Sequence, residues 1–401
     1  MEYSDNRLAD YSEDSSIGRG SIDVPFLLLV LLLLTIGVVM VLSASFARAY
    51  YSSATKHNAT FYFTRQLFFA VTGVAIMLLA SRFPINFYRR FSGVLLLFSV
   101  VMLLLVLVGG ERVNGARRWF KIGSITFQPS EIAKIAVILF EAQLICRFKD
   151  KMGSFRYGVL PFAAVAVFVV GLLVLEPHLS GSIIIILITA VMMFIGGTRL
   201  FWFLLGGGAV ALGGIIAINV LEYSSDRISA WLDPFADTSD TGYQIVQSLY
   251  AIGSGGLSGL GLGNGRQKYL YLPEEHNDFI FSVVCEELGF IGATVILILF
   301  ALLIARGFFL AMHCKERYSF LVCSGVTALL AIQVILNVAV VTNLVPCTGI
   351  SLPFFSYGGT ALWLQLAEMG VILSISRDVP EKKFIKPRAS RAQNGKAGAG
   401  A

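Results

Sequence analysis

The sequence contains little charge for its length. Asp, Glu, Lys and Arg make up only 14% of its 401 residues, whereas hydrophobic residues make up 56%, which is more apolar sequence than a soluble core can hold. The five cysteines are scattered and form no Cys-x-x-Cys pair, which argues against a disulfide framework and against a zinc site. The glycine-rich stretch 253–265 lacks the Gly-x-Gly-x-x-Gly spacing, so a nucleotide-binding loop is rejected.

The apolar residues instead gather in separate runs. Each run has about 17–25 residues, the length that a helix needs to cross a hydrocarbon layer about 30 Å thick. We therefore predict an all-α polytopic membrane protein with about ten transmembrane helices. The predicted spans are residues 24–46, 66–83, 91–108, 130–146, 157–175, 181–197, 200–220, 278–303, 318–344 and 356–376.

The distribution of Lys and Arg predicts the orientation in the cytoplasmic membrane. An even number of spans places both termini on one side, and the loops on that side carry the larger number of cations, so both termini are predicted to be cytoplasmic. We expect a cytoplasmic tail at 1–23, a membrane domain at 24–376 with a large extracytoplasmic loop at 221–277, and a basic, disordered tail at 377–401. A basic tail beside a membrane attracts anionic lipid, so nucleic acid is not an expected partner.

Cations also occur on the predicted outer face, between the third and fourth spans. Arg117, Arg118 and Lys121 lie there beside Trp119. They could be anchoring residues at the membrane surface. Because the positive-inside rule argues against idle cations on this side, we favour the alternative, a site for an anionic diphosphate headgroup and its sugar.

The fourth predicted span begins at Ser130, and we expect Ser130 or its neighbour to cap this helix. The span also carries two ionisable residues. Glu131 and Lys134 are three residues apart, so they lie on one helix face and can pair. Such a pair could lock two helices together or could serve a functional site, and the sequence favours neither. Further along, a Pro follows Glu176 at the outer end of the fifth span. That segment could be a simple turn with Ser180 capping the next helix, or it could present a carboxylate near the membrane surface.

A third group of polar residues precedes the eighth predicted span. His276 and Asp278 stand at the mouth of the membrane, and Asp278 could be only the N-cap of that helix. Glu286 and Glu287 lie about two turns deeper, so at least one of them must face protein or a polar cavity. Before the last span, Ser356 and Tyr357 lie in a Pro/Gly-rich hairpin and offer hydroxyls to a sugar-like ligand.

Together these segments resemble the SEDS (shape, elongation, division and sporulation) family of FtsW/RodA/SpoVE-like proteins. The resemblance covers about residues 20–378, and its motifs occur in family order at 117–119, 128–134, 176–177, 276–281 with 286–289, and 353–359. It implies a ten-helix peptidoglycan glycosyltransferase that polymerises lipid II, an undecaprenyl-diphosphate-linked disaccharide pentapeptide. It also implies a class B penicillin-binding protein as partner, together with other division, elongation or sporulation proteins. Asp278 matches the family's essential aspartate, and Trp119 matches a tryptophan that the activity needs.

The residues fit this chemistry. A sugar 4-hydroxyl must attack the anomeric carbon of a second sugar and displace a diphosphate, which requires a base and a cationic clamp. We expect Asp278 to be the base and Arg117, Arg118, Lys121 and Lys134 to stabilise the leaving group. A divalent cation such as Mg²⁺ or Mn²⁺ could share that task. The expected substrate-binding set is Arg117, Arg118, Trp119, Lys121, Glu131, Lys134, Glu176, His276, Ser356 and Tyr357. The competing interpretations are a lipid II flippase, which should have polar sites at both faces, and a scaffold that only recruits the penicillin-binding protein.

Overall fold

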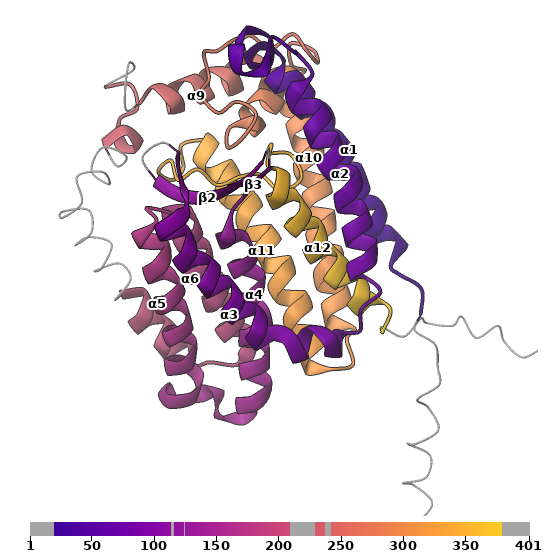
Figure 1. Ribbon diagram of the computed structural model, residues 1–401, viewed down its shortest axis with the longest axis vertical. Helices are drawn as coiled ribbons and strands as arrows, with labels where there is room; N and C mark the ends of the chain where they lie inside the picture. Colours follow the sequence, from indigo (N-terminus) through magenta and orange to yellow (C-terminus); the bar gives the residue numbers. More distant parts are fainter. Residues whose placement is uncertain (1–19, 114–115, 124, 209–228, 237–241, 379–401) are drawn as a thin grey trace, which may run out of the picture.

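The computed structural model describes residues 20–113, 116–123, 125–208, 229–236 and 242–378. Long helices run side by side and form most of the molecule (Figure 1). The elements are α1 (Val24–Tyr51), η2 (Ser53–Thr55), α2 (Phe61–Ala80), α3 (Ile85–Gly109), β1 (Glu111–Val113), β2 (Ala116–Ile122), β3 (Ile125–Phe127), α4 (Pro129–Phe148), η3 (Lys149–Gly153), η4 (Phe155–Val159), α5 (Leu160–Leu175), α6 (Leu179–Gly196), α9 (Tyr243–Gly255), α10 (Ile280–Met312), α11 (Arg317–Val341) and α12 (Gly359–Ser376).

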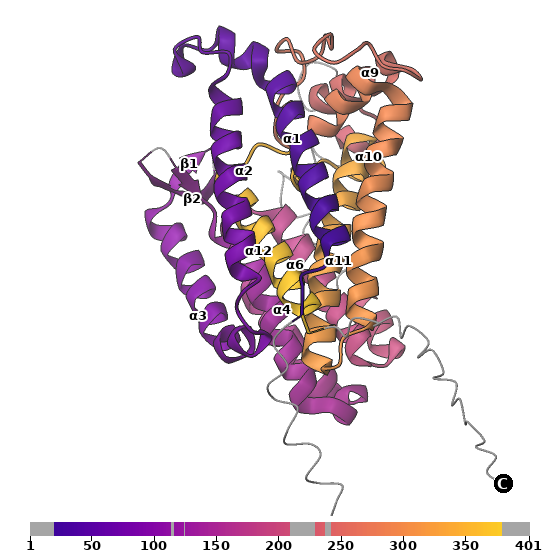
Figure 2. The same cartoon turned by 90° about the vertical axis from the view of Figure 1, so that its right-hand side faces the viewer.

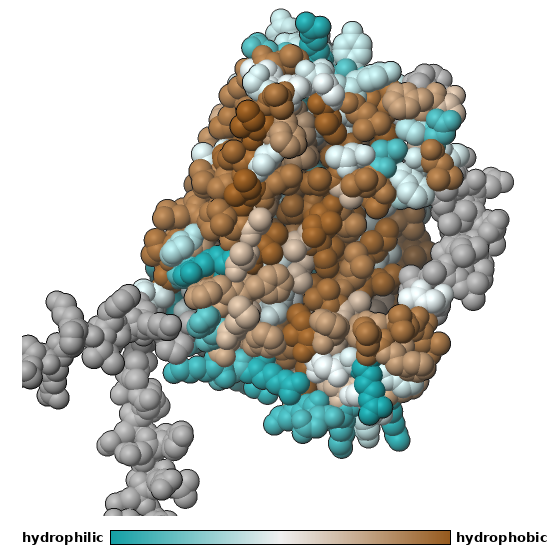
Figure 3. All heavy atoms as spheres, turned by 180° about the vertical axis from the view of Figure 1, so that it is seen from behind, coloured by the Kyte–Doolittle hydropathy of each residue, from teal (hydrophilic) through white to brown (hydrophobic). Residues whose placement is uncertain are grey.

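The bundle is built to lie in a membrane. Eight of the described helices are long and apolar enough to cross one: α1, α2, α3, η4 with α5, α6, α10, α11 and α12. On the face seen in Figure 3, the surface of the bundle is mostly apolar above a hydrophilic lower end. α4 occupies the fourth predicted span and packs against α3, α6 and α11, but its ionisable residues lower its hydropathy. Of the seventh predicted span, residues 209–220 lie outside the described residues, as do most of both predicted tails, so the count of ten helices stays a prediction.

The first and last helices meet at one end of the bundle. Asp23 caps α1 by accepting a hydrogen bond from the Phe26 backbone N–H at 2.9 Å, and its carboxylate also pairs with Arg306 at 2.5 Å. The Asp23 backbone N–H donates to the Ser376 hydroxyl at 3.1 Å. The chain therefore enters and leaves the bundle at the same end, as the predicted even number of spans requires.

A small antiparallel sheet lies between α3 and α4 at the opposite end of the bundle (Figures 1 and 2). Its strand order is β1-β2-β3, and Gly123 takes a φ of 64° in the turn between β2 and β3. The all-α prediction missed this sheet. β1 and β3 have three residues each, which is too short for an alternating pattern to be recognised.

α10 is interrupted close to its start, and this interruption holds the preceding loop. Gly289 departs from helical geometry with φ 66° and ψ −170°. The carbonyls of Glu286 and Glu287 are thereby released from the helix and accept the backbone N–H groups of Leu260 and Gly261, each at 3.0 Å. The glycine-rich stretch 253–265 is thus packed on the helix it precedes.

The two glutamate side chains complete this anchor. Glu286 accepts the backbone N–H of Arg266 at 2.7 Å, and Glu287 forms a buried ion pair with Lys268 at 2.7 Å. The Ser43 hydroxyl of α1 also lies 2.7 and 2.8 Å from the two Glu287 oxygens. Both glutamates therefore face protein, and they fix the loop that leads to Asp278.

Candidate active site

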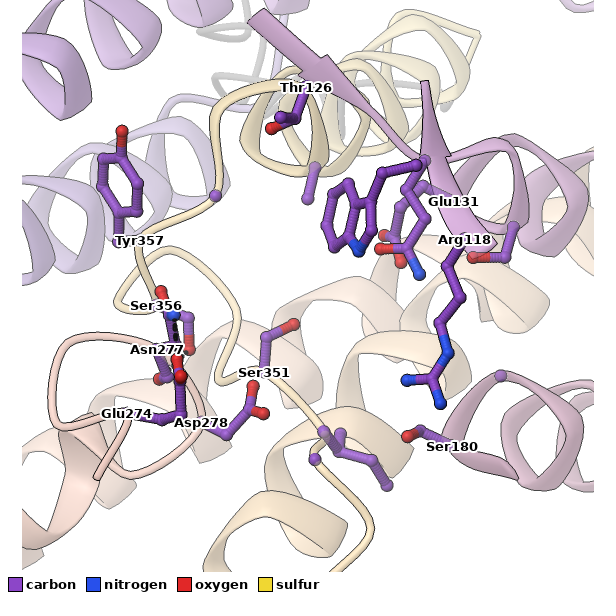
Figure 4. A pocket seen from close by; sticks show the side chains of 18 of the residues that line it. Arg118, Thr126, Glu131, Ser180, Glu274, Asn277, Asp278, Ser351, Ser356 and Tyr357 are labelled. Carbon is purple, nitrogen blue, oxygen red and sulfur yellow. Dashed lines mark hydrogen bonds between the residues drawn. The ribbon is translucent and has the colours of Figure 1, made fainter. Parts of the chain in front are cut away.

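A cavity of about 730 Å³ opens at the end of the bundle that carries the sheet. Its walls come from α1, α2, β2, β3, α4, α6, α9, α11 and α12 and from the segments before α10 and α12. Figure 4 shows Arg118 and Ser180 on one side, Tyr357 and Ser356 on the other, and Asp278 with Ser351 between them. The lining residues predicted from the sequence are Arg118, Trp119, Glu131, Lys134, His276, Asp278, Ser356 and Tyr357.

Arg118 is held in place by the turn after α5. Its Nε donates to the Glu176 carbonyl oxygen at 3.2 Å, and a second guanidinium nitrogen donates to the Pro177 carbonyl. Because two backbone acceptors orient the guanidinium, a bound anion would meet a cation that needs little rearrangement.

Three predicted binding residues are not among those that line the cavity. Successive side chains of a strand point to opposite faces, so only one of the two neighbouring arginines can enter it. Arg117 instead donates to the Leu107 and Val108 carbonyls at the end of α3, at 3.1 and 3.2 Å. Lys121 is exposed and pairs with Glu111 at 3.2 Å.

Glu176 is the third predicted binding residue that does not line the cavity. It is buried behind the Arg118 turn, and neither of its carboxyl oxygens has a partner among the described residues. Burial raises the pKa of Glu176 to about 8, against the opposing effect of Arg118. Glu176 therefore lies behind the wall that carries Arg118, and its role as a binding residue stays a prediction.

His178 and Gln128, which the sequence analysis did not select as binding residues, lie in the same wall. His178 Nε2 is 2.9 Å from Gln128 Nε2. Burial, followed by Arg118 and Lys134, lowers the pKa of His178 to about 3, so its ring is neutral. The predicted capping of α6 by Ser180 is wrong: the cap position is His178, and Ser180 donates to the Thr348 carbonyl.

The pair of ionisable residues on α4 is formed as predicted. Lys134 Nζ lies 2.6 Å from Glu131 Oε2, and both residues line the cavity. The predicted Ser130 cap is wrong, because the cap position of α4 is Gln128 and the Ser130 hydroxyl has no partner among the described residues. The cavity wall thus contains one ammonium whose charge is largely balanced.

The wall opposite Arg118 is formed by main-chain hydrogen bonds and aromatic rings (Figure 4). Ser356 Oγ accepts from the Leu352 N–H at 2.7 Å and donates to the Asn277 carbonyl at 2.8 Å, so it joins the segments before α10 and α12. The Tyr357 N–H donates to the His276 carbonyl at 2.8 Å, and the His276 ring lies 5.7 Å from the Tyr357 ring. The predicted Ser356 hydroxyl is therefore used to build the wall, whereas Tyr357 presents its ring.

Arg48 and Glu275 form an ion pair beside the cavity that the sequence analysis missed. Arg48, near the end of α1, makes two hydrogen bonds to the Glu275 carboxylate at 2.7 and 2.8 Å. Arg48 lines the cavity, as does Arg65 of α2. Both are cations at the predicted outer ends of spans, so the reasoning applied to Arg118 would also have found them.

Asp278 lies on the cavity floor. The N-cap interpretation is wrong, because the cap position of α10 is Phe279 and no side chain caps it. Burial and the nearby Glu274 raise the pKa of Asp278 to about 6, while Arg118 acts to lower it. A carboxylate in this state is still ionised at neutral pH and is basic enough to accept a proton.

Comparisons with known proteins agree on one family. A model of the cell cycle proteins FtsW, RodA and SpoVE matches residues 24–381. The chain is 40% identical over 357 residues to a probable peptidoglycan glycosyltransferase FtsW of Trichlorobacter lovleyi, covering 88% of this chain and 93% of that protein. It is 40% identical over 363 residues to the stage V sporulation protein E of Bacillus subtilis, covering 90% and 98%.

Two solved structures share the fold. One is a chain of a peptidoglycan synthase complex described for its coordination of polymerisation and crosslinking, with a TM-score of 0.74, 30% identity and coverage of 90% of this chain and 99% of that one. The other is the rod shape determining protein RodA of Thermus thermophilus, with a TM-score of 0.66, 29% identity and coverage of 90% and 98%. The chain belongs to the FtsW/RodA/SpoVE family of cell cycle proteins.

Proposed function

We propose that this protein is a peptidoglycan glycosyltransferase that polymerises lipid II at the outer face of the cytoplasmic membrane. The observation that carries the proposal is the placement of Asp278 and Arg118 in one cavity, with the carboxylate between its two walls (Figure 4). A base and an anchored cation are the two groups that the displacement of a sugar diphosphate requires.

The reaction follows from these two groups. The 4-hydroxyl of one sugar attacks the anomeric carbon of another, Asp278 takes the hydroxyl proton, and the bond to the diphosphate oxygen breaks. Arg118 and Lys134 stabilise the charge that develops on the leaving diphosphate, while Trp119 provides an apolar face for a sugar ring. Because the donor is α-linked and the product β-linked, one displacement inverts the anomeric centre, and no covalent enzyme intermediate is needed.

A divalent cation in this cavity would need ligands from the diphosphate of the substrate as well as from the protein. The described residues include no group of three or more His, Cys, Asp or Glu side chains that could hold a metal ion. The proposed mechanism contains no step through a metal.

The orientation distinguishes polymerisation from lipid flipping. The cavity opens where α1 ends, at Arg48, whereas the Asp23–Arg306 pair lies where α1 begins. The positive-inside rule assigns the Asp23 end to the cytoplasm and the cavity to the outer face. A cavity whose catalytic groups gather at the outer end favours chemistry on a substrate that has already crossed the membrane.

A crosslinking partner would bind beside the cavity. We expect the single span of a class B penicillin-binding protein to pack on the lipid-facing side of α10 and α11. α10 exposes Ile291, Val295, Ile298 and Leu302 at helical spacing, each with more than half of its surface accessible, whereas α11 is mostly buried. Unchanged copurification after Val295→Trp and Ile298→Trp would argue against this face.

The direct test uses the purified full-length protein in detergent with lipid II, alone and with its penicillin-binding partner. Glycan strands formed without another glycosyltransferase are the expected product. Asp278→Asn should abolish them, whereas Glu111→Gln, which neutralises an exposed carboxylate outside the cavity, should not. Binding of lipid II without any polymer, with or without the partner, would overturn the proposal in favour of a flippase or a scaffold.

A further inference from the structure

The main chain around Asp278 is held by hydrogen bonds, whereas its carboxylate, among the described residues, is not. Within the described residues this side chain accepts no hydrogen bond, although it lines the cavity. Neighbouring groups are tied down: the Asn277 carbonyl accepts from Ser356 at 2.8 Å. A general base must be aimed at the proton it removes, so whatever holds its main chain controls its reactivity.

The main chain of Asp278 is held by Asn337 of α11. The Asn337 side chain is fully buried, and its Nδ2 donates to the Asp278 carbonyl at 2.8 Å and to the Ile350 carbonyl at 2.6 Å. Both hydrogens of one amide are thus used to join the segment before α10 to the segment before α12. A buried polar residue in a membrane helix is costly unless it has such a task.

Gly349 lies on the other side of the carboxylate. It takes a φ of 69°, and a Cβ built on it would lie 3.0 Å from Asp278 Oδ2. The backbone at 349 therefore forms a close wall for the carboxylate, and the second hydrogen bond of Asn337, to residue 350, fixes that wall relative to Asp278.

We propose that Asn337 is a positioning residue for the polymerisation reaction, which aims the Asp278 carboxylate by fixing the Asp278 and Ile350 carbonyls together. The inference rests on the proposed role of Asp278 as the base. It assigns Asn337 no contact with the substrate, and Asn337 is not among the residues that line the cavity.

The test compares kcat and KM for lipid II in Asn337→Leu and the parent. Leu has a similar size and lacks the donors, so kcat should fall by about 10- to 100-fold, the effect of a misplacement of about 1 Å, while KM changes little. Gly349→Ala should lower kcat in the same way, because its Cβ presses on Oδ2. If Asn337→Leu does not fold, Asn337→Ala supplies the measurement, since Ala suits a helix and lacks both donors.

Asn343→Gly is the matched control. Asn343 lies just past the end of α11 and donates to the Trp231 carbonyl at 3.2 Å, and Gly tolerates its φ of 59°. Its loss removes an amide-to-carbonyl bond away from Asp278, so kcat should stay near the parental value even where the melting temperature drops.

Combining Asn337→Leu with Asp278→Asn separates the two claims. If Asn337 acts through Asp278, the double variant should be no slower than Asp278→Asn alone. A parental kcat in Asn337→Leu, or a loss that matches the unfolded fraction and recurs in Asn343→Gly, would overturn the positioning role. A near-parental rate in Asp278→Asn would instead overturn the proposed base.

Discussion

Asp278 and Glu287 are two carboxylates nine positions apart in the chain, and their surroundings are opposite. Glu287 is fully buried and accepts from Ser43, Lys268 and the Gly263 N–H. Asp278 faces a cavity and accepts nothing from the described residues. A carboxylate whose oxygens are all engaged stabilises the fold, whereas one that faces a cavity without such partners is available for chemistry. Burial alone therefore does not distinguish a structural acid from a catalytic one.

The largest effect should come from Asp278→Asn. The amide cannot take the hydroxyl proton, so the polymerisation rate should fall by about 10²- to 10⁴-fold, the usual contribution of a positioned base. Folding and lipid II binding should persist, because the side chain makes no hydrogen bond that Asn would break. Initial rates of glycan formation, with melting temperature as the control, test this, and a near-parental rate would refute the base.

Glu287→Gln should show the opposite profile. It leaves the Lys268 ammonium buried without its counter-charge, which should destabilise the protein by about 3–5 kcal/mol. Thermal unfolding in detergent measures the loss, and Lys268→Met in the same chain should recover part of it by removing the stranded charge. A Glu287→Gln protein with parental stability but no activity would reverse the comparison and place Glu287 in the chemistry.

Substitution of the two neighbouring arginines should sharpen the distinction between cavity and framework. Arg118→Ala removes a cavity cation and should lower kcat/KM for lipid II by about 10- to 100-fold. Arg117→Ala removes hydrogen bonds to α3 carbonyls and should cost stability before it costs turnover. Equal kinetic losses in the two variants would show that Arg117 also reaches the ligand, as the sequence predicted.

The smallest effect concerns pH. The pKa of Asp278 is raised to about 6, and a base works only when ionised, so kcat/KM should be level above about pH 7 and fall as pH drops through 6. One unit below the pKa, about a tenth of the sites are ionised, so the loss at pH 5 is about tenfold. A flat profile between pH 5 and 8 would exclude titration of this carboxylate.

The sequence predicted the parts of the molecule that depend on local pattern. The apolar runs located the helices, and the Glu131–Lys134 pair followed from helical spacing. Arg118, Trp119 and Asp278 were selected from their place at the outer ends of spans and from the family motifs. The structure places all three around one cavity.

What the sequence could not predict depends on contacts between distant segments. The Arg48–Glu275 pair joins residues 227 positions apart, and the apparently equivalent Glu286 and Glu287 acquire their role only from the loop folded onto them. The three-residue strands β1 and β3 are formed because α3 and α4 bring the chain together there. The strand between them, β2, decides that Arg118, and not Arg117, enters the cavity.

The Ser43–Lys268–Glu287 contact has a consequence for how the protein is made. Ser43 and Glu287 are separated by 244 positions, and a membrane protein is inserted in chain order, so α1 waits in the bilayer while most of the chain is synthesised. The loop before Asp278 gains its anchor only when α10 has entered and turned Glu287 toward Lys268. A nascent chain stopped before that point would carry Arg118 and Trp119 in place but would have no floor to its cavity, which makes assembly of the active site a late event in biogenesis.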